Sequence, residues 1–474
     1  MMQPQSDRVP SISRRDPKKI LRLFLIADMT ALLFSYLAAW AVAAGINTAF
    51  LGRSVDDLGA DRFLIFACMM IGAVLWFSHK GHYRKRLTFW SEAEQVIFTM
   101  LFCMLIDSFL QFASKQDFSR LWLISGWLMG AVFILVYRSL VRWMLKKEGR
   151  WQVRTLLVGQ GATAEEAKFA LNMEHRLGYT IVAEVPQLLP ELKQAGDWQT
   201  LCDWHLADFV LIALDGAALS ETEHAMTELT RGDIPFAICP PLRGLPVLGM
   251  EPTYFFNHDV MLLSRVNRLE EPVPQAIKRL FDLSASLLGM AVLLPFFIIT
   301  AVFIRRDGGP ALYRDQRIGA DGKVFDCLKF RTMVMNGEKI LADYLAQHAE
   351  EAERWQTHRK LSNDPRVTAL GRFLRRTSLD ELPQLMNVIK GDMSLVGPCP
   401  AMVVEAERFG KDIAHYHRVK PGITGLWQVS GRNQLSFERR VALDSWYVRN
   451  WSLWHDIAII AKTIPVVLGR KGAF

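Results

Sequence analysis

The 474-residue sequence is poor in cysteine, and its six cysteines are scattered without a CxxC pair or the histidine spacing of a zinc site. This pattern excludes a disulfide scaffold and indicates a reducing compartment with no structural metal. The chain also lacks the polar composition of a disordered protein and the glycine repeat of collagen. Nothing specific supports nucleic-acid binding, and we expect none.

Apolar residues, in contrast, are abundant: 51% of the chain is hydrophobic and 22% is charged. This apolar content is high for a soluble protein, yet 56 basic and 48 acidic residues are too many for a bundle buried in lipid. The composition therefore favours a membrane-anchored protein with large aqueous domains. The net charge of +8 suits a membrane surface or phosphorylated substrates.

The first third of the chain predicts a four-span membrane region, residues 1–149, with apolar stretches at about 20–45, 63–78, 96–113 and 121–137. Some stretches are shorter than the ~20 residues of a full span, so flanking aromatic residues are expected to complete them. Basic residues concentrate before the first span, between the second and third, and after the fourth, which places both ends in the cytoplasm. No cleavable signal peptide is predicted. We expect Asp28 and Asp107, inside spans, to face neighbouring helices or an interface.

Residues 150–257 predict a Rossmann-like α/β middle domain. Apolar runs typical of buried strands alternate with helical stretches, at Thr155–Val158, Tyr179–Val185, Phe209–Leu214 and Ile234–Cys239. The first strand runs into Gly159-x-Gly161-x-x-Ala164, which is the position of a dinucleotide phosphate loop, with Glu184 as a candidate ribose carboxylate. A lone match is weak evidence, so we favour a degenerate module used for assembly or regulation over cofactor binding.

A second apolar segment, Leu283–Ile304, is long enough to span but carries basic residues at both ends. Positive charge on both sides places both ends in the cytoplasm, and Pro295 within the segment removes a helix hydrogen bond. We therefore predict a re-entrant helix at about 278–304 that breaks near Pro295, with Ser284 or Ser286 as partners for the freed carbonyls. A simple fifth span is the alternative.

The region after this helix is rich in basic residues and contains the pair Asp380-Glu381. Ser378-x-x-Glu381 fits a capping box, but Pro383 favours Asp380 as the helix cap, which would hold both carboxylates ionised at the positive helix end. Asp380 could then act as a nucleophile and magnesium ligand. The neighbouring bases able to hold phosphates are Lys329, Arg331, Arg375 and Arg376. A plain helix cap beside a solvated basic face is an equally open interpretation.

Several strings in residues 275–474 resemble one family: KRLFD, YRDQRIG, KFRTM, TSLDELPQL, GDMSLVGP and KPGITGLWQVSGRN. They are similar to the bacterial sugar transferase family, the monotopic polyprenyl-phosphate phosphoglycosyl transferases. Within it, the chain is most similar to the undecaprenyl-phosphate galactose phosphotransferases of O-antigen synthesis. The resemblance implies an α-rich monotopic catalytic domain over 275–474, joined to the four spans and the Rossmann-like domain.

The resemblance also implies a reaction. Such enzymes transfer a hexose 1-phosphate from a UDP-hexose to undecaprenyl phosphate and release UMP, the first membrane step of O-antigen or exopolysaccharide synthesis. By this analogy Asp380 forms a covalent phosphosugar intermediate, Glu381 binds Mg²⁺, and Lys329 and Arg375 bind phosphate. The expected location is the bacterial inner membrane, multi-pass, with the catalytic domain on the cytoplasmic face. A homodimer is expected, and the sequence does not choose between galactose and glucose.

Other family positions fall on the re-entrant element, where Lys278, Arg279 and Pro295 match and Asp282 is expected to form hydrogen bonds within that element. One departure stands out: the family pattern GPRP reads Gly397-Pro398-Cys399-Pro400 here. We expect Arg432 or Arg366 to replace the missing charge, or turnover to be weakened, and Cys399 to be a small buried thiol.

Two functions of other classes remain open on the sequence. An NAD-dependent nucleotide-sugar dehydratase or epimerase would use a Tyr-x-x-x-Lys pair, for which Tyr416 and Lys420 have the spacing. The second is a non-catalytic membrane assembly or regulatory protein that keeps the fold. The reason for considering it is Cys399, which replaces the family arginine.

Overall fold

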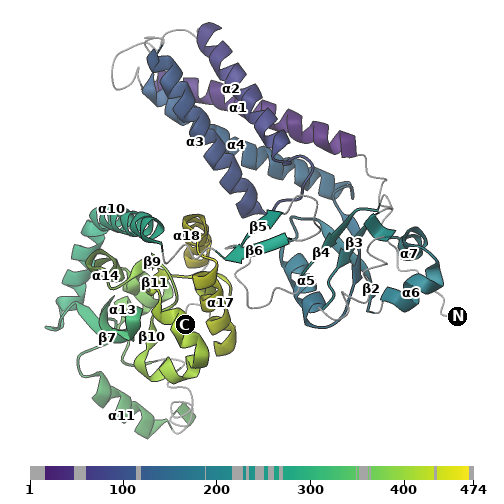
Figure 1. The fold of residues 1–474 in the computed structure, drawn as a ribbon. Coiled ribbons are helices and arrows are strands. Elements are labelled where there is room, and N and C mark those ends of the chain that lie inside the picture. The colour runs from purple at the N-terminus through teal and green to yellow at the C-terminus, as the bar shows by residue number, and fades with distance from the viewer. Residues whose placement is uncertain are drawn as a thin grey trace. The chain divides into compact units, whose positions relative to one another are not determined.

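The computed structural model describes residues 17–46, 60–113, 119–186, 188–215, 228–230, 234–240, 250–254, 261–265, 271–348, 350–351, 361, 364–431 and 435–468. The chain divides into two compact units, Met1–Pro241 and Leu242–Phe474. Figure 1 shows both as ribbons, and each is described by itself below.

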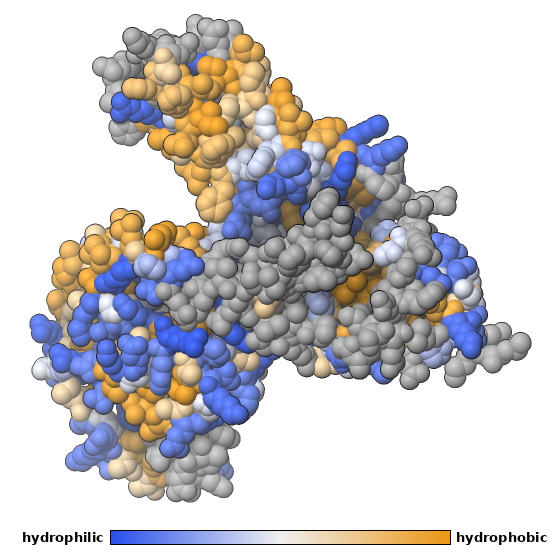
Figure 2. Space-filling model, in the orientation of Figure 1, coloured by the Kyte–Doolittle hydropathy of each residue, from blue (hydrophilic) through white to orange (hydrophobic). Residues whose placement is uncertain are grey.

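The first unit opens with four long helices that coincide with the predicted apolar stretches: α1 (Pro17–Ile46), α2 (Ala60–His79), α3 (Phe89–Ala113) and α4 (Arg120–Lys147). All four are long and apolar enough to cross a membrane. Figure 2 shows their outer surface to be largely apolar, and large side chains such as Phe112 are exposed by 78%. Exposed apolar side chains of this size fit a lipid environment.

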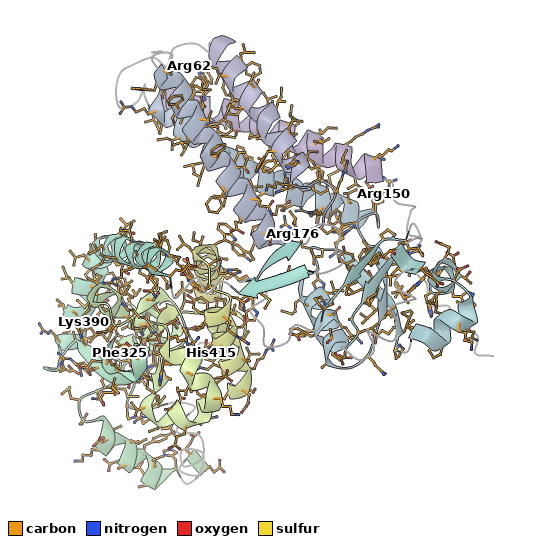
Figure 3. The ribbon with its side chains drawn as sticks, in the orientation of Figure 1. Arg62, Arg150, Arg176, Phe325, Lys390 and His415 are labelled. Carbon is orange, nitrogen blue, oxygen red and sulfur yellow. The ribbon has the colours of Figure 1, made fainter. Side chains whose placement is uncertain are left out.

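Acidic residues inside the bundle face neighbouring helices, as expected. The carboxylate of Asp28 is fully buried and accepts hydrogen bonds from Nε of Arg138 at 2.8 Å and from the hydroxyl of Tyr83 at 2.6 Å. Glu92, which the sequence had not singled out, accepts from Arg138 at 3.1 Å and from Arg176 at 2.6 Å. Arg176 follows helix α5 (Ala162–Met173) of the α/β layer, so Glu92 ties the bundle to that layer; Figure 3 places Arg176 beside the start of α3.

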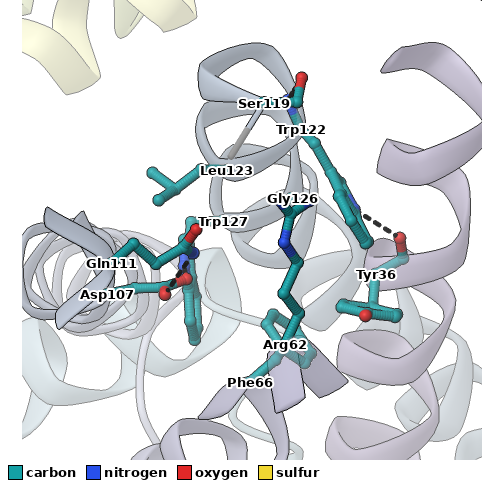
Figure 4. Close-up of a pocket in the computed structure, with 10 residues that line it drawn as sticks. All are labelled: Tyr36, Arg62, Phe66, Asp107, Gln111, Ser119, Trp122, Leu123, Gly126 and Trp127. Carbon is teal, nitrogen blue, oxygen red and sulfur yellow. Dashed lines mark hydrogen bonds between the residues drawn. The ribbon is translucent and has the colours of Figure 1, made fainter. Parts of the chain in front are cut away.

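Asp107 belongs to a small polar pocket at the other end of the bundle, where Figure 3 places Arg62. Its carboxylate accepts from the indole of Trp127 at 2.9 Å and from the side-chain amide of Gln111 at 2.8 Å, as Figure 4 shows. The guanidinium of Arg62 lies over the ring of Trp122. The cavity volume is about 30 Å³, which is room for roughly one water molecule.

The rest of the first unit is a parallel four-stranded sheet of order β2-β1-β3-β4, which confirms the predicted strands. The strands are β1 (Val153–Val158), β2 (Tyr179–Val185), β3 (Phe209–Ile212) and β4 (Phe236–Ile238), and the helices are α5 (Ala162–Met173), α6 (Leu188–Ala195) and α7 (Trp198–Trp204). The core packs Leu156, Val158, Val210 and Ile212 against Leu201 of α7. Buried apolar runs of this kind are typical of parallel strands.

The second unit begins with the antiparallel hairpin β5 (Met250–Tyr254) and β6 (Met261–Arg265), followed by α10 (Pro272–Arg305). A three-stranded sheet joins β7 (Leu312–Ile318), β8 (Val324–Phe330) and β10 (Ala401–Met402), and β9 (Ser394–Val396) pairs with β11 (Gly422–Thr424). The helices are α11 (Gly337–Gln347), α13 (Ala369–Arg376), α14 (Gln384–Lys390), α15 (Ile413–His417), α16 (Leu426–Val429), α17 (Phe437–Arg449) and α18 (Leu453–Leu468). The unit is helical with small sheets, and β8 holds a site residue.

The predicted break near Pro295 is wrong: helix α10 continues through Pro295 from Pro272 to Arg305. Residues near both of its ends contact the rest of the second unit. Near its start, the guanidinium of Arg279 donates to the carbonyls of Val388 and Ile389 at 2.6 and 2.8 Å. Near its end, the carbonyl of Ile304 accepts from Arg331 at 3.0 Å. Between these contacts the exposed face is apolar, as Figure 2 shows over α10.

Two expectations about polar partners of α10 are wrong. The hydroxyl of Ser284 donates to the carbonyl of Phe281, and the buried hydroxyl of Ser286 has no hydrogen-bond partner among the described residues, so neither serves the carbonyl freed by Pro295. Asp282 does not bond within the helix either. It accepts from the hydroxyl of Ser394 at 2.7 Å, because β9 packs directly against this turn of α10.

Candidate active site

The predicted site residues meet where β8 lies against α14. Asn387 of α14 holds the two together: its side-chain amide donates to the carbonyl of Asp326 at 2.8 Å, and its carbonyl oxygen accepts from the backbone N–H of Leu328 at 3.0 Å. Asn387 is 2% exposed, so these bonds are made inside the unit. No motif in the sequence singled out Asn387, because its role depends on a strand 59 positions earlier.

Lys329, the residue after Leu328, projects from β8 toward the acidic pair. Its ammonium lies 2.8 Å from Oε1 of Glu381, and the side chains of Lys329 and Glu381 are 25% and 38% exposed. The predicted association of Lys329 with the Asp380-Glu381 pair is thus present. Because both side chains are partly exposed, the ammonium of Lys329 could exchange the carboxylate of Glu381 for a phosphate.

The local structure of the acidic pair differs from the expectation of a helix capped by Asp380. Asp380 lies inside η4 (Leu379–Glu381), a single 3₁₀ turn, and α14 begins only at Gln384, after Pro383. Ser378 adopts a left-handed conformation (φ 55°) and its side chain makes no capping bond, so the capping box is also absent. The proline explains the difference, since it cannot donate within a continuing helix.

The environment of Asp380 also differs from the expected positive helix end that would favour both ionised carboxylates. Burial and the adjacent carboxylate of Glu381 raise the pKa of Asp380, and the cations Lys329 and Arg375 oppose this only in part. Asp380 is therefore a more basic carboxylate than a solvent-exposed aspartate. Burial would lower the pKa of Lys329, but Glu381 and Asp380 outweigh it and raise the pKa, so this lysine stays charged.

The other predicted phosphate ligands are arranged differently from one another. Arg375 lies near Asp380, and its Nε donates to the hydroxyl of Thr332 at 2.9 Å, which leaves its remaining N–H groups for other partners. Arg376, in the last turn of α13, is exposed. Arg331 is instead committed to the fold: it pairs with Asp307 and donates to the carbonyls of Pro310, Met333 and Ile304.

Two arginines were expected to replace the missing family arginine, and the structure describes one of them. Arg366 is paired with Asp364 at 2.6 Å, and Arg432 lies outside the described residues. Cys399 itself is close enough to Lys329 and Glu381 to feel their charge, and burial raises the pKa of its thiol to about 11. The backbone carbonyl of Cys399 accepts from Arg440 at 3.2 Å, a contact that the sequence had not indicated.

The basic pair on α10 is structural in its contacts. Lys278 forms a salt bridge of 2.7 Å with Asp456, whose side chain is fully buried, and also donates to the carbonyl of Val396 at 3.1 Å. The hydroxyl of Tyr447 donates to Asp456 at 2.7 Å. These bonds fasten the start of α10 to α17 and α18.

Glu381 suits a magnesium ion shared with substrate phosphates. Mg²⁺ in phosphate-transferring sites takes one or two carboxylates and keeps several waters. Glu381 contacts Lys329 through Oε1 only and is partly exposed, so its second oxygen is available. Within the described ranges, no three His, Cys, Asp or Glu side chains surround one point, so such an ion would depend on the substrate for most of its ligands.

The rival dehydratase interpretation fails on its tyrosine. The hydroxyl of Tyr416 donates to the carbonyl of Ile318 and accepts from the backbone N–H of Ala401, both at 2.9 Å. Its ring is 3% exposed and packs against Phe409. Tyr416 is therefore a core residue of the second unit.

A membrane-associated helical protein with an acidic pair, a lysine and arginines in one half-buried site has the features of a phosphate-transferring membrane enzyme. Comparison with known proteins gives the family. Residues 273–470 match the bacterial sugar transferase family, and residues 78–188 match a CoA-binding domain.

Similar proteins cover nearly the whole chain. The undecaprenyl-phosphate galactose phosphotransferase of Salmonella typhimurium is 37% identical over 98% of this chain and 100% of its own. The UDP-galactose-lipid carrier transferase of Erwinia amylovora is 38% identical over 88% and 89%. The UDP-glucose:undecaprenyl-phosphate glucose-1-phosphate transferase of Escherichia coli is 30% identical over 76% and 79%. The chain belongs to the bacterial sugar transferase family.

Proposed function

We propose that this protein transfers galactose 1-phosphate from UDP-galactose to undecaprenyl phosphate, releasing UMP. The observation that carries the proposal is Asp380, a partly buried carboxylate beside the Glu381–Lys329 pair, in a chain whose full-length similarity is to a protein named as a galactose phosphotransferase. Glucose 1-phosphate is the alternative cargo, because a relative named for glucose matches three quarters of the chain at lower identity.

In the proposed first step, an oxygen of Asp380 attacks the β-phosphorus of the UDP-sugar. A P–O bond to Asp380 forms, the bond from that phosphorus to the bridging oxygen breaks, and UMP leaves with the bonding electrons. In the second step the phosphate oxygen of undecaprenyl phosphate attacks the same phosphorus and displaces Asp380. The raised pKa of Asp380 supports this role, since a more basic carboxylate is a better nucleophile.

Lys329 and Arg375 are proposed to bind the diphosphate. Both lie near Asp380, and neither is fully committed elsewhere: Lys329 contacts a half-exposed carboxylate, and Arg375 uses one N–H group on Thr332. Glu381 would hold Mg²⁺, which supplies positive charge to the diphosphate and to the departing UMP. Arg376 is proposed as a further contact from its exposed position in the last turn of α13.

The membrane arrangement is proposed from the charge pattern and from α10. Four spans with cytoplasmic ends, an inner-membrane location and a cytoplasmic catalytic unit fit the basic residues that flank the spans. Because both ends of α10 contact the second unit, re-entry is favoured over a crossing. Cysteines introduced at Gln275 and Arg306 in a cysteine-free background should both react with an impermeant maleimide in inside-out vesicles only. Reaction of the two from opposite sides would establish a fifth span.

A homodimer is also proposed, and sedimentation of the detergent-solubilised protein tests it.

The first experiment on the reaction measures UMP release with undecaprenyl phosphate, Mg²⁺ and either UDP-galactose or UDP-glucose. Wild type should release UMP with UDP-galactose and retain radiolabelled sugar on the acid-quenched protein, and Asp380→Asn should do neither. If folded wild-type protein releases no UMP with either UDP-galactose or UDP-glucose, the assembly-protein alternative is favoured.

A further inference from the structure

The glycine turn of the α/β layer lies where doubly wound domains bind nucleotides. It connects β1 to α5, and β1 pairs on one side with β2 and on the other with β3, so the carboxyl ends of β1 and β3 form a topological switch point. The match of residues 78–188 to a CoA-binding domain implies the same kind of ligand. Whether this turn can accept a diphosphate is decided by what already occupies it.

Both glycines of the turn are required by contacts within the chain. Gly159 has φ of 131°, and a Cβ there would lie 2.1 Å from the carbonyl oxygen of Ala213, the residue after β3. Gly161 has φ of 84°, and a Cβ there would lie 2.7 Å from Oδ2 of Asp215. The space that these glycines leave open is therefore filled by the segment that follows β3, before any ligand is considered.

Asp215 places a carboxylate where a ligand phosphate would lie. Its Oδ1 accepts a hydrogen bond of 2.6 Å from the hydroxyl of Thr163, the second residue of α5, and Thr163 is 4% exposed. The N-terminal end of a helix favours a negative charge and is the usual phosphate position in such turns. Here the protein's own carboxylate takes that position, and a diphosphate would meet a like charge.

The second expected ligand contact is also taken. Glu184, the candidate ribose carboxylate at the end of β2, forms a salt bridge of 2.5 Å with Lys168 of α5. This ion pair occupies the carboxylate that would bind the ribose. The ion pair is partly exposed and therefore weak by itself, but like Asp215 it argues against a bound nucleotide.

We infer that Asp215 is the resident anion of this glycine turn and that the α/β domain does not bind CoA or a dinucleotide there. The domain keeps the architecture of a nucleotide-binding fold, with an exposed carboxylate of its own chain, Asp215, at the phosphate position. This inference is independent of the proposed transferase reaction, since it concerns residues of the first unit only.

Binding to the full-length wild-type protein gives the first test. Equilibrium dialysis with CoA and with NAD⁺ at millimolar concentration, in the presence of saturating UDP-galactose to fill the transferase site, should show no saturable binding. Saturable binding of either nucleotide under these conditions would overturn the inference.

Hydrogen exchange of α5 in the full-length protein gives the second test. In Asp215→Ala, amide exchange of residues 162–173 should accelerate about five-fold, the effect of losing a negative charge at the N-terminal end of the helix. Inorganic pyrophosphate should restore protection, and chloride at equal ionic strength should not. Asp203→Ala, which removes an exposed carboxylate on α7, is the matched control and should change nothing in α5.

Two outcomes of that experiment would refute the role of Asp215. Unchanged exchange in Asp215→Ala would show that its carboxylate does not act on α5. Faster exchange without rescue by pyrophosphate would show a simple helix cap rather than an occupied anion site. Asp215→Asn, which keeps an acceptor for Thr163 but removes the charge, should give the same pyrophosphate-dependent protection and covers the case in which the alanine variant misfolds.

Discussion

Replacing Lys329 with glutamine tests the electrostatic design of the site most directly. The change removes a cation 2.8 Å from Glu381 that also lowers the pKa of Asp380. A hydrogen bond to a charged group is worth about 1.5–3 kcal/mol, which corresponds to a loss of roughly 10- to 150-fold in kcat/KM. Because Lys329 favours ionised Asp380, its removal should also raise the pKa of that carboxyl further.

The direction in which the pH–rate profile shifts tests this effect of Lys329 on the pKa of Asp380. In the proposed mechanism activity needs ionised Asp380, so the acid limb of the pH–rate profile reports its protonation, and this limb should move to higher pH in Lys329→Gln. The assay is UMP release from UDP-galactose at saturating undecaprenyl phosphate across the acid range. Lys323→Gln is the matched control, because Lys323 is 82% exposed and pairs only with Asp321, at 3.6 Å. A loss below about three-fold with an unmoved acid limb would refute the reasoning.

Three further predictions follow from buried groups. Cys399→Ala should keep UMP release within about three-fold of wild type, because a thiol with a pKa of about 11 is neutral; a larger loss would give the cysteine a chemical role. Burial raises the pKa of Asp444 to about 7, so the folded state should lose about 4 kcal/mol of stability between pH 4 and pH 8; thermal melts should show a smaller pH dependence in Asp444→Asn. Lys278→Gln leaves the buried Asp456 unpaired and should destabilise the second unit by about 3–5 kcal/mol; adding Asp456→Asn should restore most of the melting temperature, and failure to do so would contradict the pairing.

The long apolar helices and the parallel sheet could be predicted from the sequence, because hydrophobic length and buried strand runs are local signals. The family strings contain the candidate site residues, but they do not separate residues that gather at Asp380 from residues such as Arg331 that hold the fold together. Lys329 and Glu381 are 52 positions apart, yet the resemblance already grouped them. Local spacing was less reliable at Asp380, where Pro383 ends one turn and delays the next helix to Gln384.

Contacts between distant segments were beyond the sequence. Asn387, Arg440 and Asp456 each act on a residue far away along the chain, and no periodic pattern marks them. Arg331 shows the opposite error. Its place in the basic motif suggested a phosphate contact, but its guanidinium pairs with Asp307 and donates to the carbonyls of Ile304, at the end of α10, and of Pro310 and Met333. A basic residue in a motif can position a helix as easily as it can bind substrate.

The formal charges of the site also bear on the need for magnesium. Lys329 and Arg375 balance Asp380 and Glu381, which leaves these four groups neutral before substrate binds. A UDP-sugar adds about two negative charges on its diphosphate, next to a carboxylate that must remain ionised to attack. The family arginine that would add a cation is Cys399 here. Arg376, the proposed further contact, adds one cation, which still leaves the residues around Asp380 short of positive charge for this substrate. We therefore expect the chain to depend on Mg²⁺ more steeply in Lys329→Gln than in wild type. A magnesium titration of UMP release in which both proteins reach half-maximal rate at the same concentration would contradict this charge balance.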